Sequence, residues 1–558
     1  MIVNRFKTEF AQQIFRQKYA QGPNDSWDAL AERVVEDVCG TRWGTQTALM
    51  STNERAELTE HIKAMRFLPG GRYLYYAGRP YKAYNNCYLL RAEEDTREEW
   101  SNVTWRAMSC LMTGGGIGID YSRLRPSGKP LARTGGTASG PLPLMSAINE
   151  IGRNVMQGGS RRSAIYASLN WRHEDIPTFL GAKNWPDEIK KAKEANFNFP
   201  AALDMTNISV NYDTASLGGF TQMRGIITEN SLHENPVFKR NVRQAMETGE
   251  PGFSFNFFDK ENETLRNACT EVTSEDDSDV CNLGSINLGN IHSLEEFKSV
   301  VSLASKFLVC GTLRADLPYE KVYKVREKNR RLGLGLMGIH EWLLQRGSQY
   351  EVTAELNKWL GVYRDESKRS ADEHCDRFYI SHPIAYRAIA PTGTIGILAS
   401  TTTGIEPLFA VAYKRRFLTE GTKWKYMYVV DATADRLIKE YGLKPDTIDT
   451  AYKLSTNYEQ RIKFQADVQD FVDMSISSTI NLPAWGTKAN NEACVEEFTK
   501  VLGHYAPRLR GFTCYPDGSR GGQPITECDY EEAVKHKGTV FEEHDVCSIT
   551  GHGGSCGI

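Results

Sequence analysis

An amide, a thiol and a carboxylate occupy alternating positions at the start of the stretch from Asn267 to Leu288: Asn267, Cys269 and Glu271. Side chains two residues apart point to the same face of a β-strand, so we predict a strand that presents all three together. An amide can bind a polar substrate group, a thiol can attack or abstract, and a carboxylate can move a proton. A second thiol, Cys281, follows twelve residues later. An isolated cysteine of this kind is more often a small buried hydrophobe, so other parts of the chain must decide between these interpretations.

A second chemically suggestive stretch is Ala390-Pro-Thr-Gly-Thr-Ile-Gly-Ile. Small residues with hydroxyl groups, next to a glycine that permits close backbone approach, are suited to binding phosphate oxygens, especially where the loop opens a helix. The same residues would also form an ordinary turn. The candidate phosphate-binding residues are Pro391, Thr392, Gly393, Thr394 and Ile395.

Two loops carry arginines among small polar residues. The loop from Arg123 to Gly140 contains Arg123 and Arg125, and the loop from Gly158 to Ala164 contains Arg161 and Arg162. Cations and exposed backbone amides indicate a phosphate-bearing ligand, although a solvated loop has the same composition.

Helices and strands must position these residues. Residues 9–65 have a helical hydrophobic period with an N-cap at Asp25-Ser26, and Cys87 falls in an apolar strand. The pattern predicts helices over 100–112, 144–156 and 294–313, and a strand leading into a helix after Arg330. The last 38 residues are polar, so we expect a mobile tail that carries Cys547 and Cys556.

The bulk composition gives no sign of a membrane or nucleic-acid protein. The 558 residues are 40% hydrophobic and 25% charged, with a formal net charge of −3. No segment approaches the ~18 apolar residues of a membrane span, and the N-terminus lacks the apolar core of a signal peptide. The twelve cysteines lack the dense regular spacing of a disulfide framework. We therefore expect a cytoplasmic protein whose cysteines are buried, metal-bound or catalytic, built from two to four units or from one large α/β barrel.

Seven motifs occur in the order found in one enzyme family. They are Asn85-Asn-Cys, Gly135-Gly-Thr-Ala-Ser-Gly-Pro, Arg161-Arg-Ser-Ala, Asn267-x-Cys-x-Glu, Cys281-Asn-Leu, Arg330-Arg-x-Gly-x-Gly, and Pro391-Thr-Gly-Thr with Gly404-Ile-Glu-Pro. From about Pro69 to the C-terminus, the chain resembles a ribonucleotide reductase catalytic subunit and is most similar to the class II, adenosylcobalamin-dependent enzymes. Seven motifs in order make a chance match implausible.

This resemblance implies an α/β fold: a ten-stranded α/β barrel of two five-stranded half-barrels, with Cys269 on a finger loop through its centre. We expect a helical N-terminal region over residues 1–66, a catalytic barrel domain over 67–520 and a mobile tail with redox cysteines over 521–558. The N-terminal region does not resemble the ATP-binding cone of many relatives, so overall control by ATP and dATP is not expected.

The resemblance also implies roles for the site residues. Cys269 would hold the thiyl radical that abstracts the ribose 3′ hydrogen, Glu271 would be the base at the 3′ hydroxyl, and Asn267 would bind the ribose. Cys87 and Cys281 would deliver two electrons at C2′ and end as a disulfide. The residues from Pro391 to Ile395 would bind the substrate phosphates, whether two or three are present, and no protein-bound metal is expected.

The implied cofactor is adenosylcobalamin. The implied partners are a ribonucleotide substrate, a deoxynucleotide effector read by the loops with Arg123, Arg125, Arg161 and Arg162, and a thioredoxin-like reductant that recharges Cys547 and Cys556. Those tail cysteines are eight residues apart, further than is usual in the family. The short interval from Cys87 to Gly140 has no room for the insertion of monomeric relatives. The chain therefore forms a homodimer to complete the effector site, or its effector control is reduced.

Two rival interpretations remain. One is a class I-like catalytic subunit that takes its radical from a separate ferritin-like subunit. That relay needs adjacent tyrosines where this chain has Cys514-Tyr515. The other is a non-catalytic nucleotide sensor in which Cys547, His552 and Cys556 bind zinc, although three ligands are too few for a four-coordinate structural site.

Overall fold

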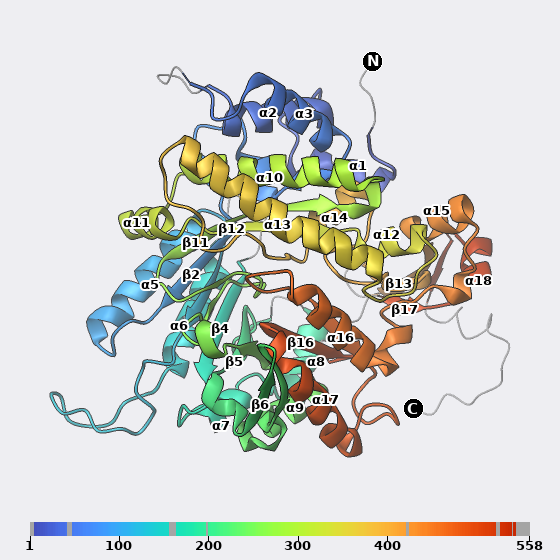
Figure 1. The fold of residues 1–558 in the computed structure, drawn as a ribbon. Helices are drawn as coiled ribbons and strands as arrows, with labels where there is room; N and C mark the ends of the chain where they lie inside the picture. The colour runs from blue at the N-terminus through green and yellow to red at the C-terminus, as the bar shows by residue number, and fades with distance from the viewer. Residues whose placement is uncertain are drawn as a thin grey trace, which may run out of the picture.

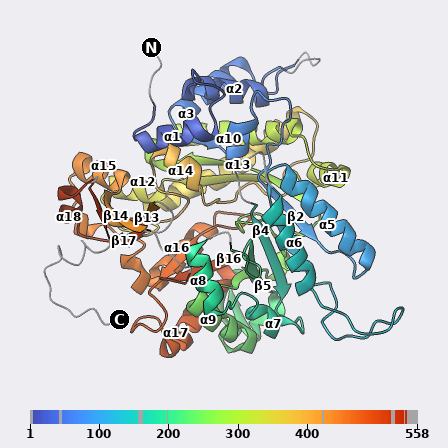
Figure 2. The same ribbon diagram turned by 180° about the vertical axis from the view of Figure 1, so that it is seen from behind.

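The computed structural model describes residues 5–41, 47–155, 163–196, 199–419, 423–519, 525–537 and 539–542. Strands form a central barrel, and helices cover its outside (Figure 1). The N-terminal helices lie together at one end of the molecule. The strands from the first half of the chain and the long helices from the second half lie on opposite sides of the barrel (Figures 1 and 2).

Five parallel strands make the first half of the barrel. Each of these strands pairs with the next in chain order through parallel hydrogen bonds. The strands are β2 (Cys87–Arg91), β3 (Gly116–Asp120), β4 (Ile165–Asn170), β5 (Thr206–Tyr212) and β8 (Gly252–Phe255). Parallel strands of this kind are covered on their outer face by the crossover helices that join them.

The second half has four regular strands and one extended segment. The strands are β11 (Asp279–Asn287), β12 (Leu332–Met337), β15 (Thr479–Leu482) and β16 (Gly511–Pro516). Parallel bridges from Leu334 to Arg387 and from Ile389 to Ile476 place the extended segment between β12 and β15. The two halves meet in antiparallel fashion where β11 pairs with β2 and β16 pairs with β8. The predicted ten-stranded α/β barrel of two half-barrels is therefore confirmed.

Helices with buried apolar faces close the outside of the barrel. The covering helices are α5 (Arg97–Met112), α6 (Leu142–Asn154), α9 (Pro236–Thr248), α10 (Leu294–Arg314), α13 (Ala354–Arg377), α16 (Tyr458–Gln469) and α17 (Val495–Tyr505). Side chains of Thr96 and Ser293 cap α5 and α10 by accepting backbone N–H bonds, as short hydroxyl residues do at helix starts. The helices predicted over 100–112, 144–156 and 294–313 are thus α5, α6 and α10.

The N-terminal region is helical, as predicted. It contains α1 (Glu9–Lys18), α2 (Trp27–Cys39) and α3 (Thr52–Lys63), followed by β1 (Phe67–Pro69) on β11 and the short α4 (Gly71–Tyr76). The side chain of Ser26 caps α2, which confirms the predicted N-cap. Helices α2 and α3 pack against α10, whereas α1 packs against α14 (Gly393–Ala399) at the mouth of the barrel (Figure 2).

A second, four-stranded sheet lies beside the barrel. Its hairpin is β13 (Ala412–Thr419) with β14 (Lys423–Val430), and its edges are β17 (Ile525–Glu527) and β18 (Val540–Glu542). Helices α15 (Ala432–Tyr441) and α18 (Tyr530–Lys535) accompany it. We expected residues 521–558 to be mobile throughout. Part of this interval instead carries regular structure, because two of its segments pair with the two edges of the hairpin. The domain boundaries at 66 and 520 remain predictions.

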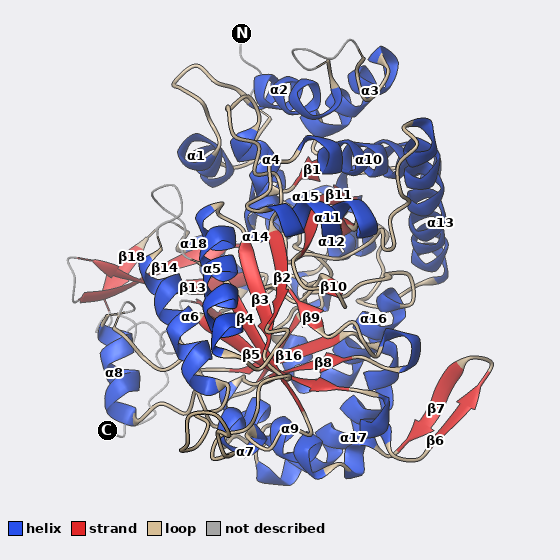
Figure 3. Ribbon diagram, turned by 90° about the vertical axis from the view of Figure 1, so that its left-hand side faces the viewer, coloured by secondary structure: helices blue, strands red, loops and turns tan. Residues whose placement is uncertain are grey.

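Several further elements lie at the periphery. These are α7 (Ile176–Leu180), α8 (Asp187–Ala195), α11 (Glu320–Asn329) and the hairpin of β6 (Phe220–Met223) with β7 (Ile226–Asn230), which projects from the body (Figure 3). The short helix α12 (Ile339–Gln345) is instead almost entirely buried. Among the residues with a described structure, no helix is both long and apolar enough to cross a bilayer.

A finger loop runs inside the barrel between two very short strands, β9 (Leu265–Arg266) and β10 (Thr273–Ser274). Glycines on β3 make room for it. A methyl group added at Gly118 would lie 1.7 Å from the carbonyl oxygen of Arg266, and one at Gly116 would lie 3.1 Å from the Ala268 side chain. The glycine run after Met112 thus has a packing role, which is to let the finger loop pass close to the strand.

Candidate active site

The tip of the finger loop presents Asn267, Cys269 and Glu271. The prediction of a strand over these residues is wrong, because they form a tight turn between β9 and β10. The Thr270 N–H donates to the Asn267 carbonyl at 3.0 Å, and Thr270 adopts a left-handed backbone with φ of 70°. The turn still brings the three functional groups to one cavity. They therefore lie together as expected, but a turn and not a strand places them there.

Hydrogen bonds to surrounding segments fix the finger loop. The Asn207 amide on β5 donates to the Ala268 carbonyl at 3.3 Å, and the Ser475 N–H donates to the Glu271 carbonyl at 2.8 Å. The buried Arg266 guanidinium donates to Asn256 Oδ1 at 2.7 Å. These contacts on both sides of the tip hold Cys269 in place, and Cys269 is exposed whereas Cys87 and Cys281 are buried.

Cys87 and Cys281 face each other across the seam between the half-barrels. They are direct partners in the antiparallel register of β2 and β11. Directly opposed residues of antiparallel strands have Cα atoms about 4.5–5.5 Å apart, within the range that a disulfide can span. Burial raises the pKa of both thiols, and the charges of Glu271 near Cys87 and Asp279 near Cys281 raise it further. Both are therefore held as protonated thiols at neutral pH.

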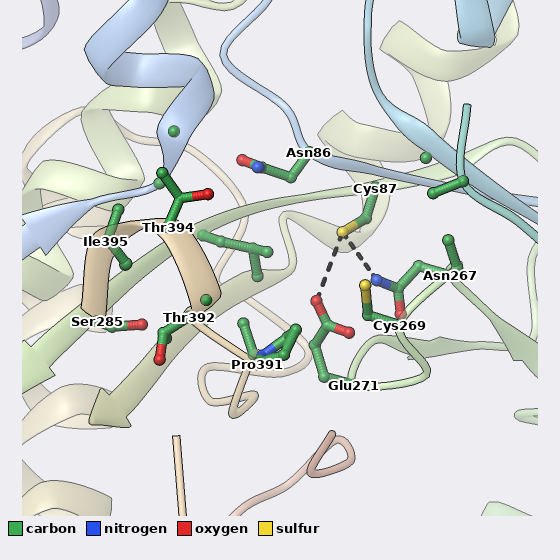
Figure 4. Close-up of a pocket in the computed structure, with 18 of the residues that line it drawn as sticks. Asn86, Cys87, Asn267, Cys269, Glu271, Ser285, Pro391, Thr392, Thr394 and Ile395 are labelled. Carbon is green, nitrogen blue, oxygen red and sulfur yellow. Dashed lines mark hydrogen bonds between the residues drawn. The ribbon is translucent and has the colours of Figure 1, made fainter. Parts of the chain in front are cut away.

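Cys87, Asn267 and Glu271 form one hydrogen-bonded group (Figure 4). The Asn267 amide donates to Cys87 Sγ at 3.0 Å, and the Cys87 thiol lies 3.8 Å from Glu271 Oε1, to which it donates. Burial raises the pKa of Glu271 to about 7, although its hydrogen bonds with Asn267 and Cys87 oppose this. The other oxygen, Oε2, is buried without a hydrogen-bond partner within the described chain. Glu271 is thus suited to take a proton near neutral pH from a group that enters the cavity.

The cavity above these groups has a volume of about 330 Å³. Its thiol end holds Cys87, Asn267, Cys269 and Glu271, and its other end holds Ser285 and the start of α14 (Figure 4). Residues 391–395, predicted to bind phosphate, all line it. Thr392 has a left-handed backbone with φ of 50°, and its hydroxyl accepts the Gly404 N–H at 2.8 Å, which ties the loop to Gly404-Ile-Glu-Pro. The structure brings the two chemically suggestive stretches together.

Two of the four predicted effector arginines, Arg123 and Arg125, are not among the residues that line this cavity. Arg123 pairs with Glu93 and Arg125 pairs with Asp95 at the end of the first half-barrel. Arg161 and Arg162 lie outside the described residues, as do the tail cysteines Cys547 and Cys556.

Several features of the site escaped the sequence analysis. Tyr19, from the N-terminal helical region, lines the cavity, as do Asn86 and Ser285. A second cavity of about 670 Å³ lies beside the finger loop, and Trp185, Asn207, Glu250, Trp485 and Asp517 are among its lining residues. Asn86 and Ser285 lie close in sequence to Cys87 and Cys281, so the motifs around these cysteines could have indicated them. The helical hydrophobic period around Tyr19 does not indicate a ligand-binding residue.

A ten-stranded barrel with an internal finger loop, a thiol at the loop tip and two further thiols in the wall defines a class of thiol-dependent catalytic subunits. The family model of the ribonucleotide reductase barrel domain matches residues 85–202, 221–358 and 384–508. The chain belongs to the ribonucleotide reductase family. It is accordingly an oxidoreductase that acts on ribonucleotides.

Known relatives agree with this assignment. The chain is 26% identical to the vitamin B12-dependent ribonucleoside-diphosphate reductase of Mycobacterium tuberculosis, over 92% of this chain and 78% of the relative. It is 25% identical to the enzyme of the same name from Thermoplasma acidophilum, over 87% and 68% of the two chains. A crystal structure of a B12-dependent (class II) ribonucleotide reductase superimposes with a TM-score of 0.70 at 16% identity, covering 96% of this chain and 95% of the other.

Proposed function

We propose that this protein reduces ribonucleotides to 2′-deoxyribonucleotides by thiyl-radical chemistry, with adenosylcobalamin as the radical source. The observation that carries the proposal is the grouping of an exposed thiol on a fixed loop tip, a partly protonated buried carboxyl and two facing thiols around one cavity. Such an arrangement holds a reactive thiol within reach of one bond of the substrate.

In the proposed first step, a Cys269 thiyl radical takes the hydrogen atom from C3′ of the ribose and becomes a thiol. Glu271 takes the proton of the 3′ hydroxyl through Oε2, the oxygen without a partner within the described chain. The Asn267 amide is held next to Cys87 and hydrogen-bonds the ribose. The substrate radical and the removed proton then set up loss of the 2′ hydroxyl as water.

Reduction at C2′ uses the facing thiols. Cys87 and Cys281 together supply two electrons and two protons, and their sulfur atoms end joined by one disulfide bond. Cys269 then returns its hydrogen atom to C3′ and becomes the thiyl radical again, and Glu271 returns its proton to the 3′ oxygen. The net change is one ribonucleotide and one dithiol converted into one deoxyribonucleotide, one disulfide and one water. The raised pKa of each thiol supports this role, because a protonated thiol carries the hydrogen that the reaction consumes.

The far end of the cavity would receive the substrate phosphates. Hydroxyls of Ser285, Thr392 and Thr394 line this end together with the glycine backbone at Gly393. No lysine or arginine occurs among the described residues that line the cavity. The phosphates would therefore be bound by hydroxyl and backbone N–H donors.

We place the cofactor at the second cavity, beside the finger loop. This cavity is about 670 Å³ in volume, and Asn207, which lines it, donates to the finger-loop carbonyl next to Cys269. Trp185 and Trp485 give it apolar walls, and its polar lining residues, which include the Lys183–Glu250 ion pair and Asp517, could bind amide groups. These residues would hold adenosylcobalamin, which when bound supplies one-electron chemistry by homolysis of its cobalt–carbon bond. The vitamin B12-dependent names of both relatives support this choice.

The class I-like alternative is less well supported. Cys514 occupies the position where a second adjacent tyrosine would stand, and it is buried in the main hydrophobic core. The ring of Tyr515 packs on Gly249, where an added methyl group would lie 2.5 Å from it. One packed tyrosine without its neighbour does not make a two-tyrosine relay.

Single-turnover chemistry tests the proposed roles of the thiols. With adenosylcobalamin and no external reductant, the reduced wild-type protein should form about one deoxyribonucleotide per chain from the Cys87 and Cys281 thiols. A second turnover should follow if the tail cysteines reduce the active-site disulfide once. Cys547→Ser and Cys556→Ser should retain the first turnover. They should fail to continue with a thioredoxin-like reductant, but dithiothreitol should restore continued turnover because it can enter the cavity.

Cys281→Ser provides the contrast, since it should not continue with either reductant. Peptide mapping after one turnover should find Cys87 joined to Cys281. Continued turnover of the tail variants with the protein reductant alone would contradict the proposed shuttle. Stoichiometric zinc in the purified protein would instead support the sensor alternative, whose residues Cys547, His552 and Cys556 lie outside the described residues. The thiol shuttle also favours the reducing cytoplasm as its location.

A homodimer through α5 would complete the effector site. Trp105, Met108 and Met112 form an apolar stripe on one face of α5, with 57%, 38% and 65% of their surfaces exposed. A second copy, pairing its α5 with this one, would bury the stripe. The nearby Arg123 and Arg125 each hold a carboxylate that a deoxynucleotide phosphate would displace.

Met112→Glu should therefore convert dimer to monomer at micromolar concentrations, because it would bury a charge against apolar side chains. Sedimentation velocity measures this, with Tyr379→Glu at a 96% exposed position as the matched control. If the wild-type protein remains monomeric with and without deoxynucleotide, the proposed dimer is wrong.

A further inference from the structure

Tyr19 lines the active-site cavity, and the helix before it packs against α14 at the proposed phosphate end. Tyr19 follows α1 and is only 6% exposed, yet it lines the same cavity as Cys269 and Thr394. A methyl group built on Gly71, another lining residue, would lie 3.0 Å from the Tyr19 hydroxyl oxygen and further from its ring carbons. The phenol therefore points its oxygen toward Gly71, at the edge of the cavity.

Packing holds the residue in this position. The Tyr19 N–H donates to the Phe15 carbonyl at 2.9 Å, and the Phe15 ring packs against Phe6 in a tilted arrangement and against Trp27 edge to face. Helix α1 packs against α14, whose first residues form the proposed phosphate-binding loop. Tyr19 thus belongs to a rigid wall and not to a surface loop.

The orientation of the substrate in the cavity would bring its terminal phosphate close to Tyr19. The ribose must reach Cys269 and Glu271, and Thr392 and Thr394 lie at the opposite end (Figure 4). A phosphate chain on the ribose extends from the thiols toward α14, and α1 lies on the outer side of α14 (Figure 2). A phosphate chain that extends past Thr394 toward α1 would therefore approach Tyr19.

We propose that the Tyr19 hydroxyl donates a hydrogen bond to the β-phosphate of a ribonucleoside diphosphate and closes the cavity behind it. This inference rests on the proposed function and deepens it by assigning the substrate class. With no lysine or arginine among the described lining residues, a hydroxyl donor at this position has a large share in binding a phosphate. The N-terminal helices, which precede the matched family segments, thereby become part of the substrate site.

Binding of nucleotides to Tyr19→Phe tests the proposal without turnover. Isothermal titration of the full chain with a ribonucleoside diphosphate and with the monophosphate of the same base gives four dissociation constants, two for wild type and two for the variant. We expect about 10- to 100-fold weaker diphosphate binding by the variant, as for loss of a hydrogen bond to a charged group, and monophosphate binding within about twofold of wild type. In turnover, KM for the diphosphate should rise by a similar factor while kcat stays within about twofold.

Two controls separate the possible failures. Tyr379→Phe, at an exposed site that does not line the active-site cavity, should leave the ratio of diphosphate to monophosphate affinity unchanged. If Tyr19→Phe leaves that ratio unchanged while wild type binds the diphosphate, the Tyr19 assignment is wrong and the proposed function stands. If wild type binds no ribonucleotide, the proposed function itself fails. Tyr19→Ala should open the end of the cavity and raise the affinity for a triphosphate relative to a diphosphate, and the opposite shift would also count against the proposal.

Discussion

Cys269→Ser should abolish deoxyribonucleotide formation under every reducing condition. Serine preserves the size and shape of the side chain, but its O–H bond is too strong for the oxygen to carry the radical in place of sulfur. We expect a loss of at least about 10³-fold, as is usual when the central reacting group of an enzyme is removed. The measurement is deoxynucleotide formation with dithiothreitol, so that neither the tail nor a protein reductant limits the rate.

The matched control is Cys494→Ser, which alters a half-buried cysteine outside the cavity and should keep wild-type activity. Nucleotide binding by Cys269→Ser should also remain, because the finger loop is held by Arg266, Asn207 and Ser475 and not by the thiol. Substantial turnover by Cys269→Ser would show that the radical role belongs to another residue.

Glu271→Gln should lower kcat by about 10²- to 10⁴-fold, the usual effect of removing a positioned general base. Burial raises the pKa of Glu271 to about 7, so in wild type kcat/KM should rise with pH through about 7 as the carboxyl ionises. The residual activity of Glu271→Gln should lack this rise of kcat/KM with pH. Glu497→Gln, which changes an exposed glutamate on α17, should keep both the activity and its pH dependence.

The same carboxyl makes a prediction about stability. Its pKa in the folded protein lies above the usual value of 4.5, so the folded state retains a proton that the unfolded state releases. The free energy of unfolding should therefore fall as pH rises from about 4.5 to about 7, by on the order of 3 kcal/mol from this group alone. Glu271→Gln should remove this fall in denaturant titrations. If wild type and variant have the same pH dependence, the raised pKa and the base role are both wrong.

The sequence allowed the barrel and most of the site to be predicted because their signals are local or ordered. The apolar strand around Cys87, the helix after Thr392 and the order of the motifs are each visible in the chain. The facing of Cys87 and Cys281 follows once the family resemblance fixes which strands pair, and the register confirms that they are opposite each other.

Features that depend on distant contacts could not be predicted in this way. Alternation over Asn267, Cys269 and Glu271 indicated a strand, but Asn207 and Ser475 hold that segment as a turn, and no local pattern encodes those partners. Gly118 is required by the carbonyl of Arg266, which lies 148 positions away in the sequence and is adjacent only in the barrel.

Tyr19 and the C-terminal strands show the same limit. The helical period of α1 says which face packs, but not that Tyr19 at its end reaches the active site. The polar composition after residue 520 indicated mobility, yet Ile525–Glu527 and Val540–Glu542 gain order from the edges of a hairpin that begins more than a hundred residues earlier.

The most direct test of the central claim uses the purified chain alone, with adenosylcobalamin, dithiothreitol and a ribonucleotide. We predict that deoxyribonucleotide forms without any second subunit, and that none forms when adenosylcobalamin is omitted. Product that appears only after a separate ferritin-like subunit is added would contradict this prediction, and would assign the radical to the class I-like route.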